Sequence, residues 1–150
     1  MPVKQVAFNR KALHDYEILE KFEAGMVLMG TEIKSIRKGS VQFKDAYVSF
    51  INHEAFIKEM FIAHYEEGNR FNHEETRERK LLLHDYEINK LERKVKLKGY
   101  TVIPLAIYLK DGRAKMEIAL AQGKNVHDKR ESDKEKDAQR EIAKVMKSKR

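Results

Sequence analysis

At 150 residues, the chain has room for one closed core and little else. It contains no cysteine, which excludes a disulfide framework, thiolate metal ligands and a cysteine nucleophile. Its formal net charge of +7 favours a polyanionic partner, and no apolar run is long enough for a signal peptide or a membrane span, so we expect a soluble cytoplasmic protein without a membrane partner.

The first half of the chain predicts strands around one short helix. Residues 16–29 alternate loosely between apolar and charged side chains, as in a strand with one face in water. Residues 30–39 place apolar side chains at helical spacing behind Thr31, which we expect to be the N-cap. Residues 46–64 are rich in β-branched and aromatic side chains, and the polar interruption at residues 52–54 predicts a hairpin.

A loop and then a longer helix are predicted next. Residues 66–80 are polar and without periodicity, and their end is basic, which is typical of a cationic loop. After them, Asp85 is positioned to cap a helix that Gly99 ends. The apolar stripe of this helix consists of Ile88, Leu91 and Val95.

Two further strands complete the predicted fold. They occupy residues 100–109 and 113–121, on either side of the short-turn signal Asp111-Gly112. Pro104 lies inside the first of them, which indicates an edge, a bulge or a corner there. The pattern amounts to about five or six short antiparallel strands with one or two helices. We therefore predict a mainly β fold, best matched by a small antiparallel β-barrel.

The last 28 residues form a basic tail, with ten Lys and Arg residues against six Asp and Glu residues. Because the tail has few apolar residues, we expect it to be disordered in the free protein and to become ordered on a polyanion. Residues 132–135 nevertheless form a capping box, and one helical stripe follows it, made of Ala138, Ile142, Val145 and Met146. Such a helix either forms on binding or packs back on the barrel. We divide the chain into a folded domain, residues 1–122, and a tail, residues 123–150.

Three His-Asp pairs, beginning at His14, His84 and His127, are the candidates for a catalytic or metal site. Adjacent residues on a helix or strand point in different directions, so these pairs make poor chelates and poor catalytic dyads. The chain also lacks zinc-protease, nucleophile-elbow and phosphate-loop motifs. We expect no metal, no cofactor and no enzymatic activity, and interpret the histidines as surface, capping or base-stacking residues.

Basic residues cluster at several places, and the aromatic residues Phe8, Tyr16, Tyr47 and Phe71 lie near some of them. Basic side chains position phosphates and aromatic faces stack on unpaired bases, so these clusters indicate RNA binding, with solvated faces and core aromatics as the alternative. Glu32 is the acidic exception in an otherwise cationic helix. It either supports the first turn of that helix or accepts a hydrogen bond from a base edge or a ribose hydroxyl.

Four blocks of sequence, taken together, resemble one family. They are residues 9–12 with 14–16 (NRKA and HDY), 30–35 (GTEIKS), 77–83 (RERKLLL) and 123–130 (GK followed by HDKR). In this order they resemble the SsrA-binding protein family, also called small protein B. The resemblance implies an oligonucleotide-binding-type β-barrel with flanking short helices. It also implies a non-enzymatic adaptor that binds the tRNA-like part of transfer-messenger RNA and delivers it to stalled bacterial ribosomes in trans-translation.

The same resemblance implies roles for individual residues. The RNA-binding surface would comprise Asn9, Arg10, His14, Tyr16, Glu32, Arg37, Arg77, Arg79 and Lys80. The tail residues on the ribosome, in the decoding centre and the mRNA channel, would be Gly123, His127, Asp128, Lys129, Arg130, Val145 and Met146. Elongation factor Tu would be an indirect partner through the aminoacylated RNA, and we expect a monomer. The alternatives are a general single-stranded RNA-binding or initiation-factor-like barrel protein, and a hydrolase or metalloenzyme whose histidines share one pocket.

Overall fold

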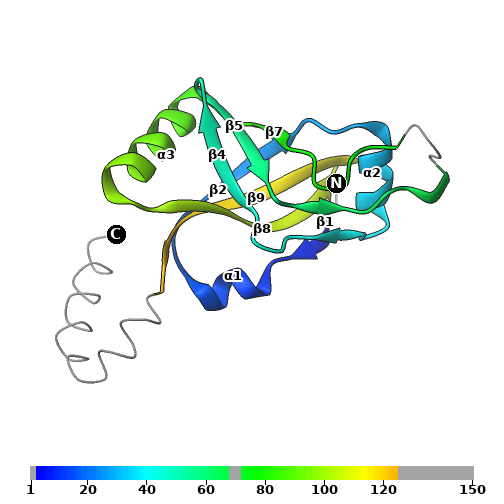
Figure 1. The fold of residues 1–150 in the computed structure, drawn as a ribbon, viewed down its shortest axis with the longest axis horizontal. Coiled ribbons are helices and arrows are strands. Elements are labelled where there is room, and N and C mark those ends of the chain that lie inside the picture. The colour runs from blue at the N-terminus through cyan, green and yellow to red at the C-terminus, as the bar shows by residue number, and fades with distance from the viewer. Residues whose placement is uncertain (1–2, 68–71, 125–150) are drawn as a thin grey trace.

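The fold is built on one antiparallel sheet of seven strands in the order β1-β8-β9-β2-β7-β5-β4 (Figure 1). The structure is a computed structural model, and it describes residues 3–67 and 72–124. Strands β3 and β6 form a second, two-stranded sheet. This mainly β, antiparallel architecture confirms the predicted fold class. The described strands are β1 (Val3–Phe8), β2 (Tyr16–Met26), β3 (Val41–Gln42), β4 (Tyr47–Ile51), β5 (Glu54–Lys58), β6 (Phe61–Ile62), β7 (Arg79–Leu82), β8 (Thr101–Lys110) and β9 (Arg113–Gly123), and the helices are α1 (Arg10–Asp15), α2 (Gly30–Arg37) and α3 (Asp85–Lys98).

The seven-stranded sheet curls, so that its edge strand β4 lies against β8, which is only one strand from the opposite edge. Strands β2, β8 and β9 are the longest and form the continuous centre of the sheet. In Figure 1, β4 and β5 cross in front of these strands, while α3 lies at one end of the sheet and α2 at the other. The curl lets side chains from both walls fill one interior, as in a small barrel.

Both predicted hairpins are present, with turns at Asn52-His53 and Asp111-Gly112. All four turn residues have positive φ, between 51° and 79°. Two consecutive left-handed residues give the type I′ geometry, whose twist matches that of the flanking strands. In β8, the register against β9 shifts between Pro104 and Ala106, which confirms a bulge at the proline.

Helix α3 follows the predicted apolar stripe. Ile88 and Leu91 are buried and Val95 packs against the core, so this face fixes the helix on the sheet. Gly99 ends the helix with a φ of 71°, a left-handed conformation that glycine adopts without strain. Although α3 is the longest helix of the described residues, none of their helices is long and apolar enough to cross a membrane.

The N-caps differ from the prediction in both longer helices. Met29 is the N-cap of α2, and its N–H donates to Oε1 of Glu32 at 2.8 Å. His84 is the N-cap of α3, and its N–H donates to Oε1 of Glu87 at 2.9 Å. In each case a glutamate three residues into the helix satisfies a backbone donor that would otherwise be unpaired. The residues predicted as caps, Thr31 and Asp85, lie inside the first turn.

Four short elements escape the sequence patterns. Strand β1 is largely exposed and shows no alternation, and α1 has only six residues, with Ala12 as its one buried side chain. Strands β3 and β6 have two residues each, too few for any period to be visible. The loop predicted through residue 80 ends earlier than expected, because the four-residue strand β7 already begins at Arg79.

Candidate nucleic-acid interface

Glu32 lies at the centre of a buried ionic cluster with Arg77 and Arg79. Its Oε1 accepts from Nη2 of Arg77 at 2.6 Å, and its Oε2 accepts from Nε of Arg79 at 2.6 Å and Nε of Arg77 at 3.1 Å. The side chains of Glu32 and Arg79 are 0% exposed, whereas that of Arg77 is 33% exposed. Helix α2 and strand β7 are therefore joined through one carboxylate.

Arg79 anchors the cluster to the surrounding backbone. Its guanidinium donates to the carbonyl oxygens of Met60 at 2.8 Å, Glu75 at 3.0 Å and Glu74 at 3.3 Å. A buried charge is tolerated only when it is both paired and hydrogen-bonded, and Arg79 meets both conditions. Arg79 thus holds the chain segment before β7 against the start of that strand.

The pKa of Glu32 is the balance of opposing causes. Burial raises it, but the hydrogen bonds from Arg77, from the Met29 N–H and from Arg79 outweigh burial, so the pKa is below its ordinary value. The carboxylate is therefore charged throughout the neutral range. Of the two roles open for Glu32 from the sequence, the structure shows support of the first turn of α2.

This burial corrects two of the expected RNA contacts. Glu32 and Arg79 have no exposed surface, so neither can touch an RNA in this conformation. The sequence could not reveal this, because the partners are 45 and 47 positions apart in the chain. Of the three members of the cluster, only Arg77 presents side-chain surface to solvent.

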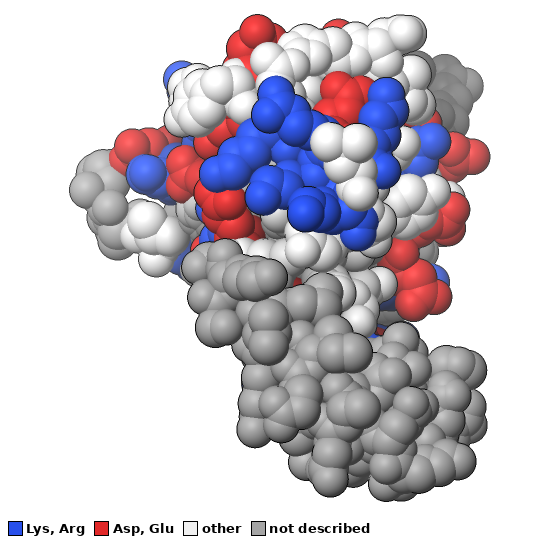
Figure 2. Space-filling view, turned by 90° about the vertical axis from the view of Figure 1, so that its left-hand side faces the viewer, with Lys and Arg blue, Asp and Glu red and all other residues white. Residues whose placement is uncertain are grey.

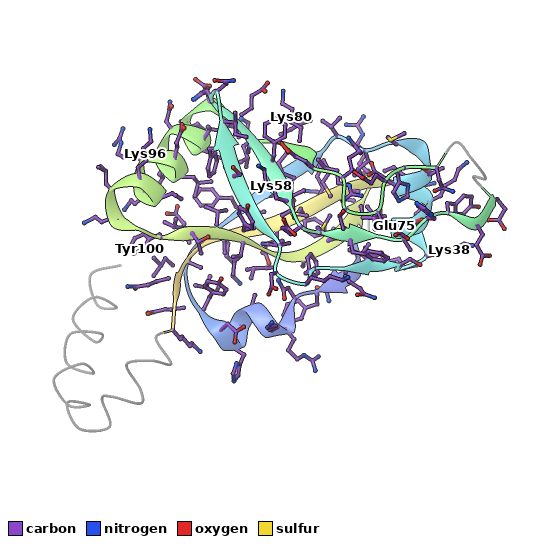
Figure 3. The ribbon with its side chains drawn as sticks, in the orientation of Figure 1. Lys38, Lys58, Glu75, Lys80, Lys96 and Tyr100 are labelled. Carbon is purple, nitrogen blue, oxygen red and sulfur yellow. The ribbon has the colours of Figure 1, made fainter. Side chains whose placement is uncertain are left out.

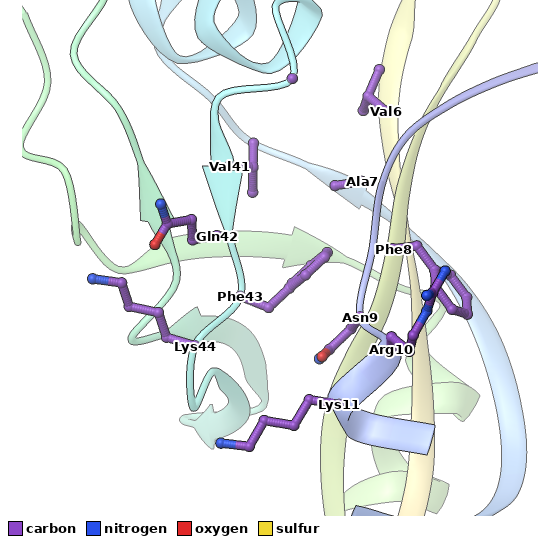
Figure 4. A pocket seen from close by; sticks show the side chains of 11 residues that line it. Val6, Ala7, Phe8, Asn9, Arg10, Lys11, Val41, Gln42, Phe43 and Lys44 are labelled. Carbon is purple, nitrogen blue, oxygen red and sulfur yellow. The ribbon is translucent and has the colours of Figure 1, made fainter. Parts of the chain in front are cut away.

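A groove near the N-terminus is lined by two of the other expected residues, Asn9 and Arg10. We call it the N-terminal groove: it is lined by residues 6–11 on one side and residues 39 and 41–44 on the other, and encloses about 360 Å³ (Figure 4). Arg10 and Lys11 come from the start of α1, and Lys44 follows β3 on the opposite wall. A smaller cavity of about 70 Å³ adjoins it, shares Lys11 and Lys44 as lining residues, and is also lined by Tyr16.

Asn9 positions this wall of the groove. Its Oδ1 accepts from the Ala12 N–H at 3.2 Å as the N-cap of α1, and its Nδ2 donates to the Pro104 carbonyl at 2.8 Å. The side chain is only 9% exposed. Both ends of the amide are thus engaged within the protein, which fixes the start of α1 and the direction of Arg10 and Lys11.

Lys44 is a residue that sequence reasoning missed. Its φ of 51° lies in the left-handed region, which a lysine adopts at a cost. Its Nζ lies 4.8 Å from the centre of the Phe61 ring, within cation–π range. In the sequence, Lys44 is an isolated cation between Phe43 and Asp45, and nothing there indicates that it lines the same groove as Arg10 and Lys11.

The remaining expected residues lie outside the N-terminal groove. Arg37 is exposed on α2, where its Nη2 donates to the Gly112 carbonyl at 3.4 Å. Lys80 forms an ion pair with Glu54 at 2.7 Å and lies along the upper edge of the molecule, away from α1 at the lower edge (Figures 1 and 3). The structure therefore does not bring these two residues together with Arg10.

Two further cations lie close to the ring of Tyr65. The Nζ atoms of Lys34 and Lys38 lie 5.5 Å and 5.0 Å from the centre of its ring. Figure 3 shows Lys38 at the end of the molecule where α2 lies. The sequence does not reveal this contact, because it depends on how Tyr65 packs against α2 in the folded chain.

The histidines do not assemble into one site within the described residues. His14 Nδ1 lies 3.0 Å from Asp15 Oδ1, so the expectation that neighbouring His and Asp side chains do not meet is wrong for this exposed pair. His73 is buried between the Ile62 carbonyl and the Thr31 hydroxyl, each at 2.8 Å. No group of three or more potential metal-binding side chains occurs in residues 3–67 and 72–124.

The tail predictions fall mostly outside the described residues. Gly123 is described, and it belongs to β9, where it pairs with Tyr16. Lys124 continues this contact, because its N–H donates to the Asp15 carbonyl at 2.9 Å. The folded part therefore extends beyond the boundary expected at residue 122. The other tail residues expected to contact the ribosome, His127, Asp128, Lys129, Arg130, Val145 and Met146, lie outside the described residues.

Comparison with known proteins gives a consistent result. The family described as "SmpB protein" matches residues 6–148. The SsrA-binding protein of Sulfurihydrogenibium sp. (strain YO3AOP1) is 54% identical over 99% of this chain and 98% of its own length, and that of Bacillus cereus (strain G9842) is 56% identical over 95% and 92%. A solved structure described as "tmRNA-SmpB: a journey to the center of the bacterial ribosome" superposes with a TM-score of 0.68 at 46% identity, covering 83% of this chain and 86% of that chain.

Proposed function

Since the chain belongs to the SmpB protein family, we propose that it binds the tRNA-like part of transfer-messenger RNA and delivers it to stalled ribosomes. In this role it is an adaptor in the bacterial cytoplasm with no catalytic step of its own. Contact with elongation factor Tu is then indirect, through the aminoacylated RNA. Two observations support this proposal: the family match covers residues 6–148, and the N-terminal groove is lined by cations.

The observation that carries the proposal is the chemistry of the N-terminal groove. Arg10, Lys11 and Lys44 place three cations around one cavity, and Tyr16 adds an aromatic side chain to its extension. Cations hold the phosphates of a nucleic acid, and aromatic faces stack on its unpaired bases. Lys11 has a carboxylate partner, but that pair with Asp45 is 3.5 Å apart and exposed, so phosphates can replace it at little cost.

The buried cluster acts on RNA binding indirectly. Glu32 and Arg79 hold Arg77 at the surface, and we assign them a positioning role rather than an RNA contact. Arg77 retains exposed surface and is the member of the cluster that can reach a phosphate. Arg37, Lys80 and His14 remain proposed contacts, on parts of the surface other than the N-terminal groove.

The tail is proposed to act separately from the folded domain. Because Gly123 and Lys124 are held by Tyr16 and Asp15, the natural cut lies after Lys124 rather than before Gly123. We propose that the residues beyond this cut make the ribosome contacts. A chain ending at Lys124 should melt cooperatively and bind the tRNA-like RNA as the full chain does, yet fail to support tagging of stalled peptides.

The first experiment tests the groove. The variant Arg10→Gln/Lys44→Gln should bind the tRNA-like RNA about tenfold more weakly at roughly 0.1 M salt, with a salt slope lower by about two. The variant Lys4→Gln/Lys58→Gln loses the same charge at positions that do not line the groove, and it should bind normally. Equal weakening by both variants would show that net charge alone drives binding.

The same titration separates the proposal from its alternative. A general single-stranded RNA-binding protein would bind an unrelated RNA as well as the tRNA-like RNA, at both salt concentrations. Preference for the tRNA-like RNA that persists at high salt supports the adaptor role, because the charge contribution common to all RNAs falls with salt.

A further inference from the structure

The two walls of the N-terminal groove are strands that do not pair with each other. One wall is β1, the edge strand of the seven-stranded sheet, and the other is β3, which pairs only with β6. Within the described residues, no backbone hydrogen bond joins β1 to β3. In Figure 4 the two walls run in the same direction, from Val6 to Asn9 and from Val41 to Lys44. The groove is therefore flanked by two strands that each have one free edge.

The pairing of β1 with β8 shows which backbone groups lie on the free edge of β1. The Asn9 N–H donates to the Leu105 carbonyl of β8 at 2.7 Å. Hydrogen-bonded and non-hydrogen-bonded pairs alternate along an antiparallel ladder, so the N–H and C=O of the preceding residue, Phe8, point away from β8. The Val6 carbonyl oxygen lies 3.9 Å from the position that a Cβ on Gly39 would take, so it points towards the opposite wall. The free edge of β1 thus presents the N–H and C=O of Phe8 and the C=O of Val6.

The pairing of β3 with β6 gives a similar result for the opposite wall. Val41 lies opposite Ile62, but the Ile62 N–H donates to the Glu75 carbonyl at 2.9 Å and the Ile62 carbonyl accepts from Nε2 of His73 at 2.8 Å. Ile62 therefore makes no ladder bond to Val41, which identifies a non-hydrogen-bonded pair. In such a pair the N–H and C=O of both residues point outwards, so those of Val41 point away from β6. Val41 lines the groove, and its free edge borders it.

The side chains of the groove determine which kind of strand it fits. Val6 and Val41 are half-buried and pack against the core, so they form an apolar floor. Three cations surround this floor, and none of the described residues that line the groove is acidic. Within the described residues, Arg10 and Lys44 form no ion pair, and Lys11 forms only an exposed one. A complementary strand therefore alternates apolar and acidic side chains.

We propose that the N-terminal groove binds an extended acidic segment of a partner protein as an added β-strand. The segment lies between β1 and β3 and pairs with the free edge of each, which is recognition by β-augmentation. Because the two walls run in the same direction, a segment of the opposite direction makes antiparallel pairs with both, and antiparallel pairing is slightly the more stable. The amino end of the segment then lies beside Asn9 and Lys44, and its carboxyl end lies beside Val6.

The free edges distinguish this groove from a surface that is only basic. Figure 2 shows Lys and Arg side chains gathered at the end of the molecule where α3 lies. Inside a helix, however, the backbone N–H and C=O groups bond to one another and offer no edge to an added strand. The groove combines cations with unpaired strand edges, and only another extended peptide backbone matches the spacing of those edges.

A bound strand has a consequence for RNA binding, and this consequence alone rests on the proposed function. Acidic side chains of the strand occupy Arg10, Lys11 and Lys44, which are the cations proposed to hold RNA phosphates. The groove then holds either the RNA or the partner protein. Strand binding would thus regulate the RNA site by direct competition.

The test follows the backbone amide signals of the full-length protein by nuclear magnetic resonance. The probe is an acetylated six-residue peptide of alternating glutamate and valine. We expect the Phe8 and Val41 signals to shift most, because both N–H groups gain acceptors. Methylation of the valine nitrogens blocks one edge of the peptide and methylation of the glutamate nitrogens blocks the other, so either change should weaken binding about tenfold. A paramagnetic label at the amino end of the peptide should broaden the signal of Lys44 more than that of Val6.

Variants of the protein test the same contacts from the other side. Val41→Pro removes the N–H at the free edge and leaves the bonds to β6 intact, and proline is accepted on edge strands. It should bind the peptide about tenfold more weakly. Its control is Val41→Ala, which shortens the side chain but keeps the N–H and should bind nearly as wild type does. Arg10→Gln/Lys44→Gln should weaken binding of the glutamate peptide and leave binding of a threonine–valine peptide unchanged.

Three results would overturn the inference. The first is that the glutamate–valine peptide leaves the Phe8 and Val41 signals unshifted. The second is that neither methylated peptide binds more weakly, which would show that the groove recognises charge alone, as an RNA site does. The third is that these signals shift with protein concentration in the absence of peptide, which would assign the edges to a second copy of the chain. If Val41→Pro does not fold, the methylated peptides decide. The peptide titration contains no RNA, so failure of the proposed function is seen separately, as a lack of preference for the tRNA-like RNA.

Discussion

The buried cluster at Glu32 and the exposed cations of helix α3 interact with their surroundings in opposite ways. In the cluster, one carboxylate and several carbonyl oxygens satisfy Arg77 and Arg79, and Arg79 has no exposed surface. On α3, Arg93 and Lys98 have no carboxylate partner among the described residues and are exposed to solvent. The first group stabilises the fold, whereas the second leaves its charge available to a partner.

The difference shows that a cluster of basic residues in a sequence is not by itself a binding site. Arg77, Arg79 and Lys80 lie within four consecutive residues, yet all three are paired with glutamates. Three substitutions and one pH titration test this contrast.

Glu32→Ala should cause the largest loss of stability. It leaves the guanidinium of Arg79 buried without a counter-charge and removes the acceptor for the Met29 N–H, so we expect a cost of about 3–5 kcal/mol. The measurement is urea unfolding at pH 7. Glu54→Ala, which breaks the half-exposed pair with Lys80, is the control and should cost less than about 1 kcal/mol.

RNA binding by the same variant sharpens the assignment. If Glu32 only positions its neighbours, Glu32→Ala protein that remains folded should lose affinity for the tRNA-like RNA and for an unrelated RNA to the same extent. Selective loss of the tRNA-like RNA would contradict the positioning role and restore a direct contact.

Arg77→Ala should have an intermediate effect. It removes two of the hydrogen bonds to Glu32, but Arg79 and the Met29 N–H remain as partners, so we expect a cost of about 1–3 kcal/mol. Thermal unfolding compared with Arg37→Ala, whose side chain makes only a long contact to the Gly112 carbonyl, provides the measurement. A cost no larger than that of Arg37→Ala would mean that Arg79 alone neutralises Glu32.

The cluster also predicts a dependence of stability on pH. The folded-state pKa of Glu32 lies below its ordinary value of 4.5, so its charged interactions contribute fully above pH 4.5 and are lost as the pH falls through the folded-state pKa. The difference in unfolding free energy between wild type and Glu32→Gln should therefore be constant near neutrality and shrink below pH 4.5. A difference that persists unchanged in acid would assign the stabilisation to packing rather than to charge.

The smallest effect is expected on α3. Lys90→Gln breaks a pair with Glu20 in which both side chains are more than 40% exposed, so the cost should be within about 0.5 kcal/mol. Differential scanning calorimetry against wild type is sufficient. A larger loss would mean that the ion pair between Lys90 and Glu20 helps to hold α3 on the sheet.

Local chemistry made several elements predictable. The turns at Asn52-His53 and Asp111-Gly112, the end of α3 at Gly99 and the bulge at Pro104 each follow from the backbone preferences of a few adjacent residues. Strand β1 and helix α1 were not predicted, because their stability comes from β8 and from Asn9 rather than from a pattern of their own.

For the candidate site, too, some features follow from the sequence and others only from the tertiary structure. The sequence by itself determined the mainly β class, the docked face of α3 and the four blocks that indicate the family, since each is encoded in neighbouring residues. Only the tertiary structure decided that Glu32 and Arg79 are buried, that Lys44 lines the same groove as Arg10, and that two lysines lie close to the ring of Tyr65. Each of these depends on contacts between residues far apart in the chain, and a side chain is buried or exposed according to those contacts rather than to its own polarity.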